Sequence, residues 1–209
     1  MVNPVKKGYS LRVPKPLPKH LRQEELDILF KAIKSPRDRA MFMLMLRCGL
    51  RVAEVAGLSL GAIDPVRRRL AIHDAKWGRD RVVYLSDDAL RALGDYLRVR
   101  APSRSHKVFL NQKGPYRGQS LTIRGIKKRM EYYAKKTGLR VSCHQLRHTM
   151  ATQMLNADAE LVTIQDLLGH SWITTTQRYC RVSNQKVERD YYKAMEVVMQ
   201  RTTYNQFPT

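Results

Sequence analysis

The sequence is poor in cysteine and has no long apolar run. Its three cysteines, Cys48, Cys143 and Cys180, are widely separated and include no CxxC pair, which argues against both a disulfide framework and a structural zinc site. The longest apolar run, around residues 40–46, is far shorter than the roughly 20 residues that a membrane-spanning helix needs. No secretory leader pattern opens the chain. We therefore expect a cytoplasmic protein that does not insert into membranes.

Acidic residues are also scarce. The chain has 18 Asp and Glu against 39 Lys and Arg, so its formal net charge at pH 7 is +21. This excess favours a polyanionic partner, either a nucleic acid or the surface of an anionic membrane. The sequence holds neither a GxxxxGK[ST] loop nor a carboxylate cluster, the patterns of nucleotide and hard-metal sites. We therefore expect no cofactor and no metal ion.

The 209 residues suffice for one packed core. Residues 1–20 combine five basic residues with four prolines, a composition typical of an extended basic arm that lies along DNA, or of a solvated linker. Residues 21–182 carry the regular patterns of a folded domain, and residues 183–209 are expected to form a carboxy-terminal helix or tail.

Helical periodicity covers most of the chain. An apolar stripe over residues 21–33 predicts a first helix, and Ser35-Pro36 predicts the start of a second helix that Gly49 ends. A further helix is expected over residues 89–97, before Pro102. From residue 121 the pattern is helical almost to the end, with interruptions at Gly138, at Gly169 and around Ser183.

Alternating residues predict a small sheet. Residues 69–73 and 81–85 flank a polar turn, which is the pattern of a β-hairpin. We expect a third strand over residues 108–110. The predicted fold class is therefore mainly α with a small antiparallel β-sheet (α+β).

Four segments carry residues suited to chemistry on a phosphodiester. Cleavage of DNA without a metal needs positive groups around the non-bridging oxygens, an acid for the departing 5′ oxygen and a nucleophile. Arginine suits the first task because its permanently charged fork holds two phosphate oxygens. The segments are Cys48-Gly49-Leu50-Arg51-Val52-Ala53-Glu54, Lys76-Trp77-Gly78-Arg79-Asp80-Arg81, His144-Gln145-Leu146-Arg147-His148, and Leu168-Gly169-His170 with Thr174-Thr175-Thr176 and Tyr179.

In this order the four segments resemble the two motif boxes and the intervening hairpin lysine of the tyrosine recombinase, or phage integrase, family. The resemblance covers about residues 21–182. Its specificity lies in the agreement of several motifs, because a lone HxxRH pattern recurs by chance. His170 follows Arg147 by 23 residues, and Tyr179 follows His170 by 9. The resemblance implies the tyrosine recombinase catalytic-domain fold for these residues.

The resemblance also implies roles for single residues. Arg51 and Arg147 match the two family arginines, which clamp the scissile phosphate as negative charge grows. His144 and His170 match positions that exchange a proton with the nucleophile and hydrogen-bond the phosphate, respectively. Taken one at a time, each arginine also fits a surface position, and each histidine fits a structural one.

Lys76 matches the hairpin lysine of the family, which implies a general acid for the 5′ oxygen. Trp77 stands where the family usually has glycine, and Arg79 is a second cation close by. A solvated hairpin lysine is therefore the alternative interpretation.

Tyr179 is the candidate nucleophile. Its phenol reacts poorly at neutral pH unless the arginines and a histidine stabilise the phenolate. The chain has ten tyrosines, so the stretch from His170 to Tyr179 is what distinguishes this one. Tyr191 and Tyr192 are rivals, but no such histidine precedes them.

Four further residues have expected supporting roles. Glu54 and Asp64 match acidic positions of the first box and would hold arginines or helix ends, although an ordinary surface carboxylate explains each nearly as well. His148 is interpreted as a packing residue that supports Arg147. Gly169 is expected to permit a tight turn that directs His170 toward the site.

What the resemblance implies as a whole is a site-specific recombinase. Tyr179 would form a 3′-phosphotyrosyl link, and a partner strand's 5′ hydroxyl would reverse the step, so neither ATP nor a metal is needed. The implied partners are double-stranded DNA with specific sites and further copies of the chain, in a tetramer. A helix over residues 186–199 would dock on a neighbouring subunit or fold back on its own core. The family usually has a helical core-binding domain before this part, where we expect only the basic arm. The sequence therefore fits either a catalytic fragment or a naturally short member that resembles the fimbrial-switch invertases.

Two other interpretations stay open. A type IB topoisomerase would use similar chemistry to relax any supercoiled DNA, and a catalytically silent accessory protein would bind DNA without cutting it. The stretch from Leu168 to Tyr179 favours a recombinase over the first, and the complete set of six candidate residues argues against the second.

Overall fold

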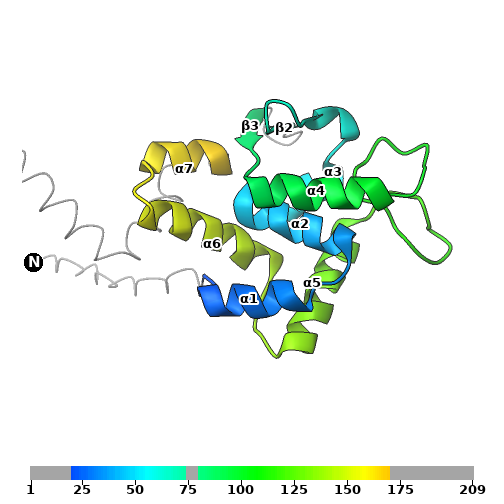
Figure 1. The fold of residues 1–209 in the computed structure, drawn as a ribbon, viewed down its shortest axis with the longest axis horizontal. Helices are drawn as coiled ribbons and strands as arrows, with labels where there is room; N and C mark the ends of the chain where they lie inside the picture. Colours follow the sequence, from blue (N-terminus) through cyan, green and yellow to red (C-terminus); the bar gives the residue numbers. More distant parts are fainter. Residues whose placement is uncertain (1–19, 74–79, 170–209) are drawn as a thin grey trace, which may run out of the picture.

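A computed structural model describes residues 20–73 and 80–169 (Figure 1). Helices predominate in this part of the chain, and the strands are short. The elements, in chain order, are α1 (Gln23–Ala32), α2 (Pro36–Arg47), α3 (Val52–Gly57), the 3-10 turn η1 (Leu60–Ala62), β1 (Ile63–Asp64), β2 (Arg69–Ile72), β3 (Arg81–Tyr84), α4 (Asp87–Val99), α5 (Ile123–Thr137), α6 (Cys143–Asn156) and α7 (Leu161–Leu168).

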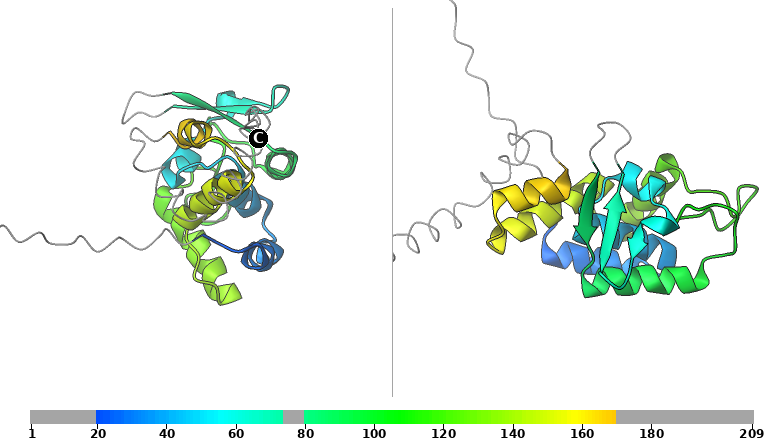
Figure 2. Two further views of the ribbon diagram at one scale, coloured as in Figure 1. Left: turned by 90° about the vertical axis from the view of Figure 1, so that its left-hand side faces the viewer. Right: turned by 90° about the horizontal axis from the view of Figure 1, so that it is seen from above.

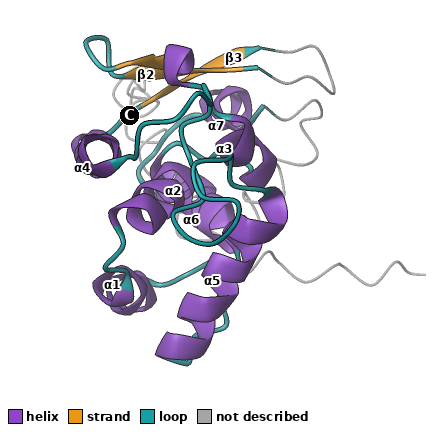
Figure 3. Ribbon diagram, turned by 90° about the vertical axis from the view of Figure 1, so that its right-hand side faces the viewer, coloured by secondary structure: helices purple, strands orange, loops and turns teal. Residues whose placement is uncertain are grey.

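The elements are layered around α2. This helix lies in the middle of the domain and packs mainly against α4 and α6. The sheet lies along one side, while α1 and α5 lie toward the opposite side (Figure 3). α7 packs on both α6 and β3, so it lies next to one edge of the sheet (Figure 2). The predicted class, mainly α with a small antiparallel sheet, is confirmed.

The helix α2 begins and ends where the sequence predicted. Ser35 is the N-cap residue and accepts a hydrogen bond from the amide of Asp38, and Pro36 occupies the first turn, where no amide partner is needed. The apolar run 40–46 is buried in the core. Gly49 follows the helix with φ +64°, and a Cβ there would lie 2.8 Å from Leu168 Cδ2. Glycine at this position therefore allows the end of α7 to approach closely.

The hairpin prediction is confirmed, but the predicted third strand is wrong. β2 pairs antiparallel with β3, and the third strand of the sheet is β1 rather than residues 108–110. Asp64 explains the position of β1, because its carboxylate accepts bonds from the Arg67 amide and the Arg69 side chain and so closes a tight turn into β2.

Residues 108–110 are buried but form no strand, and Leu110 makes only an isolated antiparallel bridge with Ser120. The Tyr96 hydroxyl donates to the Val108 carbonyl and accepts from the Leu110 amide, at 3.1 and 3.2 Å. Arg100 Nε donates to the same Val108 carbonyl at 3.0 Å. Side chains of α4 and its C-cap thus satisfy groups that a strand neighbour would otherwise satisfy.

The breaks predicted at Gly138 and Gly169 are present, since both residues have left-handed backbone conformations, with φ of +71° and +59°. The structure adds a break over residues 157–160 that the sequence pattern missed. Asp158 has φ +64° there, a conformation that Asp adopts more readily than most residues. The break around Ser183 lies outside the described residues.

Several other expectations concern what the domain does not contain. Within residues 20–73 and 80–169 no helix is long and apolar enough to cross a membrane, and no group of three or more His, Cys, Asp or Glu side chains in that part is placed to hold a metal ion. Cys48 and Cys143 are buried free thiols. Cys180, the basic arm up to residue 19 and the helix expected over residues 186–199 lie outside the described part of the chain.

Candidate active site

Arg51 stands at the N-terminus of α3, where a local motif fixes it. It is the N-cap residue, and its backbone amide donates to Glu54 Oε2 at 2.7 Å. Its guanidinium also donates to Glu54, from Nη1 to Oε1 at 2.9 Å. One carboxylate three residues along therefore holds both the backbone and the side chain of Arg51.

His144 and Arg147 lie in the first turns of α6. Ser142 caps this helix by accepting a bond from the Gln145 amide, and residues three apart share a helix face. The Arg147 side chain is buried, with the residue only 3% exposed. The His144 ring packs edge-on against that of His148, with centroids 4.0 Å apart.

The carboxyl end of α7 joins these arginines. Arg51 Nη2 donates to the Gly169 carbonyl at 2.8 Å, and Arg147 donates to the carbonyls of Gly49 and Leu168. Carbonyls at a helix C-terminus lack intrahelical partners and carry partial negative charge. The two predicted clamp arginines are thus oriented by backbone oxygens from two parts of the chain, Gly49 after α2 and residues 168–169 at the end of α7.

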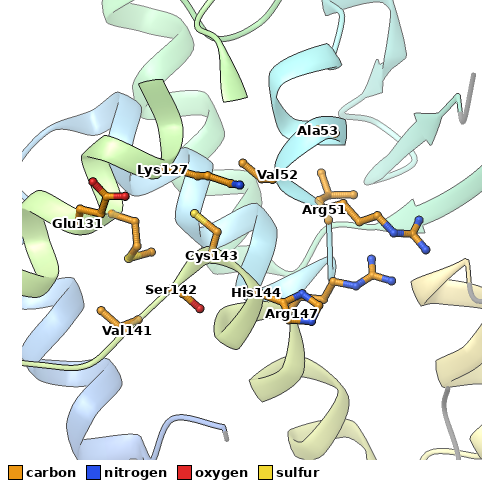
Figure 4. A pocket seen from close by; sticks show the side chains of 12 residues that line it. Arg51, Val52, Ala53, Lys127, Glu131, Val141, Ser142, Cys143, His144 and Arg147 are labelled. Atoms are coloured by element: carbon orange, nitrogen blue, oxygen red, sulfur yellow. The ribbon is translucent and has the colours of Figure 1, made fainter. Parts of the chain in front are cut away.

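Arg51, His144 and Arg147 share the lining of one cleft, with a volume of about 690 Å³. Figure 4 shows both guanidinium groups projecting toward the same side, with His144 beside Arg147. Apolar residues of α3, α5 and α6 and the polar side chains of Lys127, Glu131 and Ser142 line the rest. The arrangement therefore offers two permanent cations and an imidazole to an anionic ligand.

The charges around the cleft set the protonation of its titratable groups. Burial lowers the pKa of His144, and the positive charges of Arg147 and Arg51 lower it further, so the neutral imidazole persists to lower pH. For Glu54, burial acts to raise the pKa, but the Arg81 hydrogen bonds and charge, the Arg51 amide and the Arg147 charge outweigh it. The pKa of Glu54 lies below its ordinary value, and the group is a carboxylate at neutral pH.

The structure brings together only part of the predicted site. Arg51, His144 and Arg147 line the cleft, and Glu54 binds Arg51 from outside the lining. Lys76, His170 and Tyr179 lie outside the described residues. His148 contacts the His144 ring. Asp64 lies away from the cleft lining and binds Arg67 and Arg69 in the turn before β2.

Two residues at or beside the site had no role predicted from the sequence, although Arg81 belongs to one of the four motif segments. Lys127 of α5 lines the cleft. Arg81 binds Glu54 with two hydrogen bonds, from Nη1 to Oε1 at 2.7 Å and from Nη2 to Oε2 at 2.8 Å. Arg81 shares a strand face with the buried Val83. The sequence feature that could have indicated a role for Arg81 is its place on the apolar face of a predicted strand.

Two solved structures to which this chain is similar are recombinases. The crystal structure of XerA recombinase matches with a TM-score of 0.76 and 26% sequence identity, covering 87% of this chain and 66% of that one. The structure of the XerH site-specific recombinase bound to difH substrate, in a pre-cleavage complex, matches with a TM-score of 0.69 and 26% identity, covering 85% and 54%. The fold is that of tyrosine recombinase catalytic domains.

The sequence comparisons agree with the fold. The pattern of the Phage integrase family matches residues 19–186. Tyrosine recombinase XerC of Myxococcus xanthus is 35% identical over 207 residues, covering 92% of this chain and 67% of the relative. Tyrosine recombinase XerA of Pyrococcus horikoshii is 32% identical over 183 residues, covering 88% and 64%. The chain belongs to the phage integrase family of tyrosine recombinases, and it spans about two thirds of the length of these relatives.

Proposed function

We propose that this chain cleaves and rejoins DNA strands at specific sites through a 3′-phosphotyrosyl intermediate formed by Tyr179. The observation that carries the proposal is the convergence of Arg51, His144 and Arg147 on one cleft, although α3 and α6 lie far apart in the sequence. Two guanidinium groups on one anion are suited to a phosphate whose negative charge grows in the transition state. The tyrosine recombinases among the relatives support the same reaction.

The cleavage step follows from the chemistry of these groups. The Tyr179 oxygen attacks the phosphorus, the bond from phosphorus to the 5′ oxygen breaks, and the 3′ phosphate stays on the enzyme. His144 accepts the phenol proton, for which its neutral imidazole is suited. Lys76 gives a proton to the 5′ oxygen. In the second step the 5′ hydroxyl of the partner strand attacks the phosphorus and gives its proton to Lys76. The bond from phosphorus to the Tyr179 oxygen breaks, and His144 returns its proton to Tyr179.

The end of α7 supports a role for His170 at the same phosphate. The Gly169 carbonyl belongs to the peptide bond that leads into His170, and it lies 2.8 Å from Arg51 Nη2. Gly169, the residue that precedes His170 in the sequence, is therefore held beside one of the clamp arginines. We assign His170 a hydrogen bond to the phosphate.

The partners we propose are double-stranded DNA with specific recombination sites and further copies of this chain, in a tetramer that aligns two sites. The net charge of +21 supports a DNA partner, as does the XerH structure, which contains its difH substrate. The tetramer rests on the family resemblance, with residues 183–209 as the segment exchanged between subunits.

Covalent capture tests the proposed function with a DNA library in place of one chosen target sequence. The full chain is incubated, with EDTA present, with a library of duplexes that each carry a randomised stretch beside one nick. Cleavage next to the nick releases a short oligonucleotide, so rejoining fails and the covalent adduct accumulates. We expect adducts that survive denaturation with SDS and that are enriched in one DNA sequence.

The variants identify the nucleophile. Tyr179→Phe is expected to remove the adduct while DNA affinity stays within about twofold, because only the attacking oxygen is lost. The matched control Tyr192→Phe is expected to form the adduct like the unaltered chain. An unaltered chain that binds DNA without any adduct would instead indicate the accessory function, and adducts without sequence enrichment would indicate the topoisomerase.

A further inference from the structure

Arg81 is almost fully enclosed and connects three elements. Its side chain is 10% exposed. Nη1 and Nη2 donate to the two oxygens of Glu54 on α3, at 2.7 and 2.8 Å, and Nε donates to the Leu167 carbonyl on α7, at 2.9 Å. A guanidinium that faces a carboxylate with two parallel bonds is held in one orientation. The first residue of β3 is thereby tied to both α3 and α7.

The Glu54 carboxylate connects Arg81 to Arg51. Its Oε1 accepts from Arg51 Nη1 as well as from Arg81 Nη1, and its Oε2 accepts from the Arg51 amide as well as from Arg81 Nη2. A shift of Glu54 would therefore move both the backbone and the side chain of Arg51. The orientation of Arg51 toward the cleft depends on a carboxylate that Arg81 holds from the other side.

Arg81 also belongs to the set of arginines at the end of α7. The carbonyls of Leu167, Leu168 and Gly169 accept bonds from Arg81, Arg147 and Arg51, respectively. Three consecutive carbonyls thus bind cations supplied by β3, α6 and α3. This end of α7 carries the negative end of the helix dipole, which favours such cations.

The packing of Gly169 provides independent support. A Cβ on Gly169 would lie 3.1 Å from Arg81 Cδ and 3.1 Å from Arg81 Nη1. These distances are tighter than ordinary van der Waals contact, so the backbone of Gly169 lies directly on the Arg81 side chain. The point at which the chain leaves α7 toward His170 is therefore set by Arg81 in packing as well as in hydrogen bonding.

We propose that Arg81 is a positioning residue for DNA cleavage, which orients Arg51 through Glu54 and fixes the end of α7 from which the chain continues to His170. This inference rests on the proposed function. Arg81 itself does not bind the phosphate, because all three of its nitrogens are used by Glu54 and Leu167 in an enclosed position. Its effect on cleavage is transmitted through Arg51 and the end of α7.

The test separates cleavage from binding in the full chain. The substrate is the duplex that the unaltered chain selects in the covalent capture experiment, and the readouts are the single-turnover rate of adduct formation and the affinity for the same duplex without a nick. For Arg81→Gln we expect cleavage to slow by about 10-fold to 10²-fold, since small misplacements of catalytic groups cost this much, while affinity changes less than about twofold. The control Arg98→Gln removes one charge from a side chain that is 79% exposed on α4 and should leave both values unchanged.

Two further measurements distinguish positioning from loss of fold. The carboxylate of Glu54 faces Arg51, Arg81 and Arg147, and the Arg81 bonds lower its pKa, so Arg81→Gln should move the acid limb of the cleavage profile to higher pH. Arg81→Lys retains the charge but loses the fork and should show a smaller shift. In the absence of DNA, backbone amides of residues 164–169 should exchange hydrogen faster in Arg81→Gln than in Arg98→Gln.

The outcomes are distinguishable from those of the proposed function. The inference on Arg81 is overturned if Arg81→Gln cleaves as fast as Arg98→Gln, or if its DNA affinity falls as much as its cleavage rate. It is also overturned if the amides of α7 exchange at the same rate in both variants, a result that requires no cleavage activity. A lack of adduct from the unaltered chain would instead contradict the proposed function itself.

Discussion

Asp38 and Glu54 are both buried carboxylates that bind two arginines, and they lie in different surroundings. Asp38, whose side chain is fully buried, accepts from Arg37 and Arg129 and also from the Tyr133 hydroxyl. Glu54, whose side chain is 7% exposed, accepts from Arg51 and Arg81. In each cluster one arginine is nearly buried and the other is about one third exposed, Arg129 at 34% and Arg51 at 37%.

The two clusters differ in what covers the exposed arginine. The Arg129 guanidinium lies over the rings of Tyr132 and Tyr133, at 4.7 and 5.2 Å from their centroids, and Arg37 uses a further donor on the Leu110 carbonyl. This cluster ties α2 to α5 and to the loop at residue 110. Arg51, in contrast, lines a cleft together with a second arginine and a histidine. A buried carboxylate with two arginines is thus by itself a structural feature. The Glu54 cluster differs because its Arg51 lines a cleft that a second arginine and a histidine also line.

Asp38→Asn should have the largest effect on stability. The change leaves the buried Arg37 without its counter-charge, and breaking a buried ion pair costs about 3–5 kcal/mol. Urea unfolding measured by circular dichroism should show this loss in the free energy of unfolding. At a temperature at which the variant is folded, its rate of adduct formation should equal that of the unaltered chain. Slower cleavage by the folded variant would show that the two clusters are coupled.

Arg147→Gln should have the opposite effect, a loss of cleavage rate rather than of stability. Removing one preorganised donor from a developing negative charge typically lowers the rate about 10²-fold to 10³-fold, so single-turnover adduct formation should fall by that factor. The matched variant is Arg129→Gln, which makes the same replacement in the Asp38 cluster. It should lower the unfolding free energy and leave cleavage by the folded protein unchanged. Equal losses of cleavage in both variants would contradict the assignment of Arg147 to the site.

The smallest effect is expected from the protonation of His144. Because burial, Arg147 and Arg51 lower its pKa in the folded state, the unfolded chain takes up a proton first as the pH falls through about 6.5. The stability that His144 contributes is therefore complete above that pH and is lost as the pH falls through the folded-state pKa. The melting temperature of His144→Gln should fall less between pH 7.5 and pH 5.5 than that of the control His106→Gln, whose altered side chain is exposed. Equal falls would contradict this electrostatic account.

Features that depend on interactions between neighbouring residues were predicted correctly, whereas features that depend on distant residues were not. The start of α2 at Ser35-Pro36, the left-handed turns at Gly138 and Gly169 and the β2–β3 hairpin were predictable, because each depends on a few neighbouring residues. The third strand was not predictable from alternation, because a side chain distant in sequence, the Tyr96 hydroxyl, binds the Val108 carbonyl and the Leu110 amide. The break at Asp158 was missed because no glycine or proline marks it.

The sequence by itself determined the family and named the residues that meet at the cleft, since the motifs around Arg51 and Arg147 are read from short stretches. Only the tertiary structure decided what holds those residues. Arg81 binds a carboxylate 27 positions away and a carbonyl 86 positions away, and no local pattern encodes either contact. The physical reason is that the partners of Arg81 depend on how β3 packs against α3 and α7, and this packing depends on the whole core.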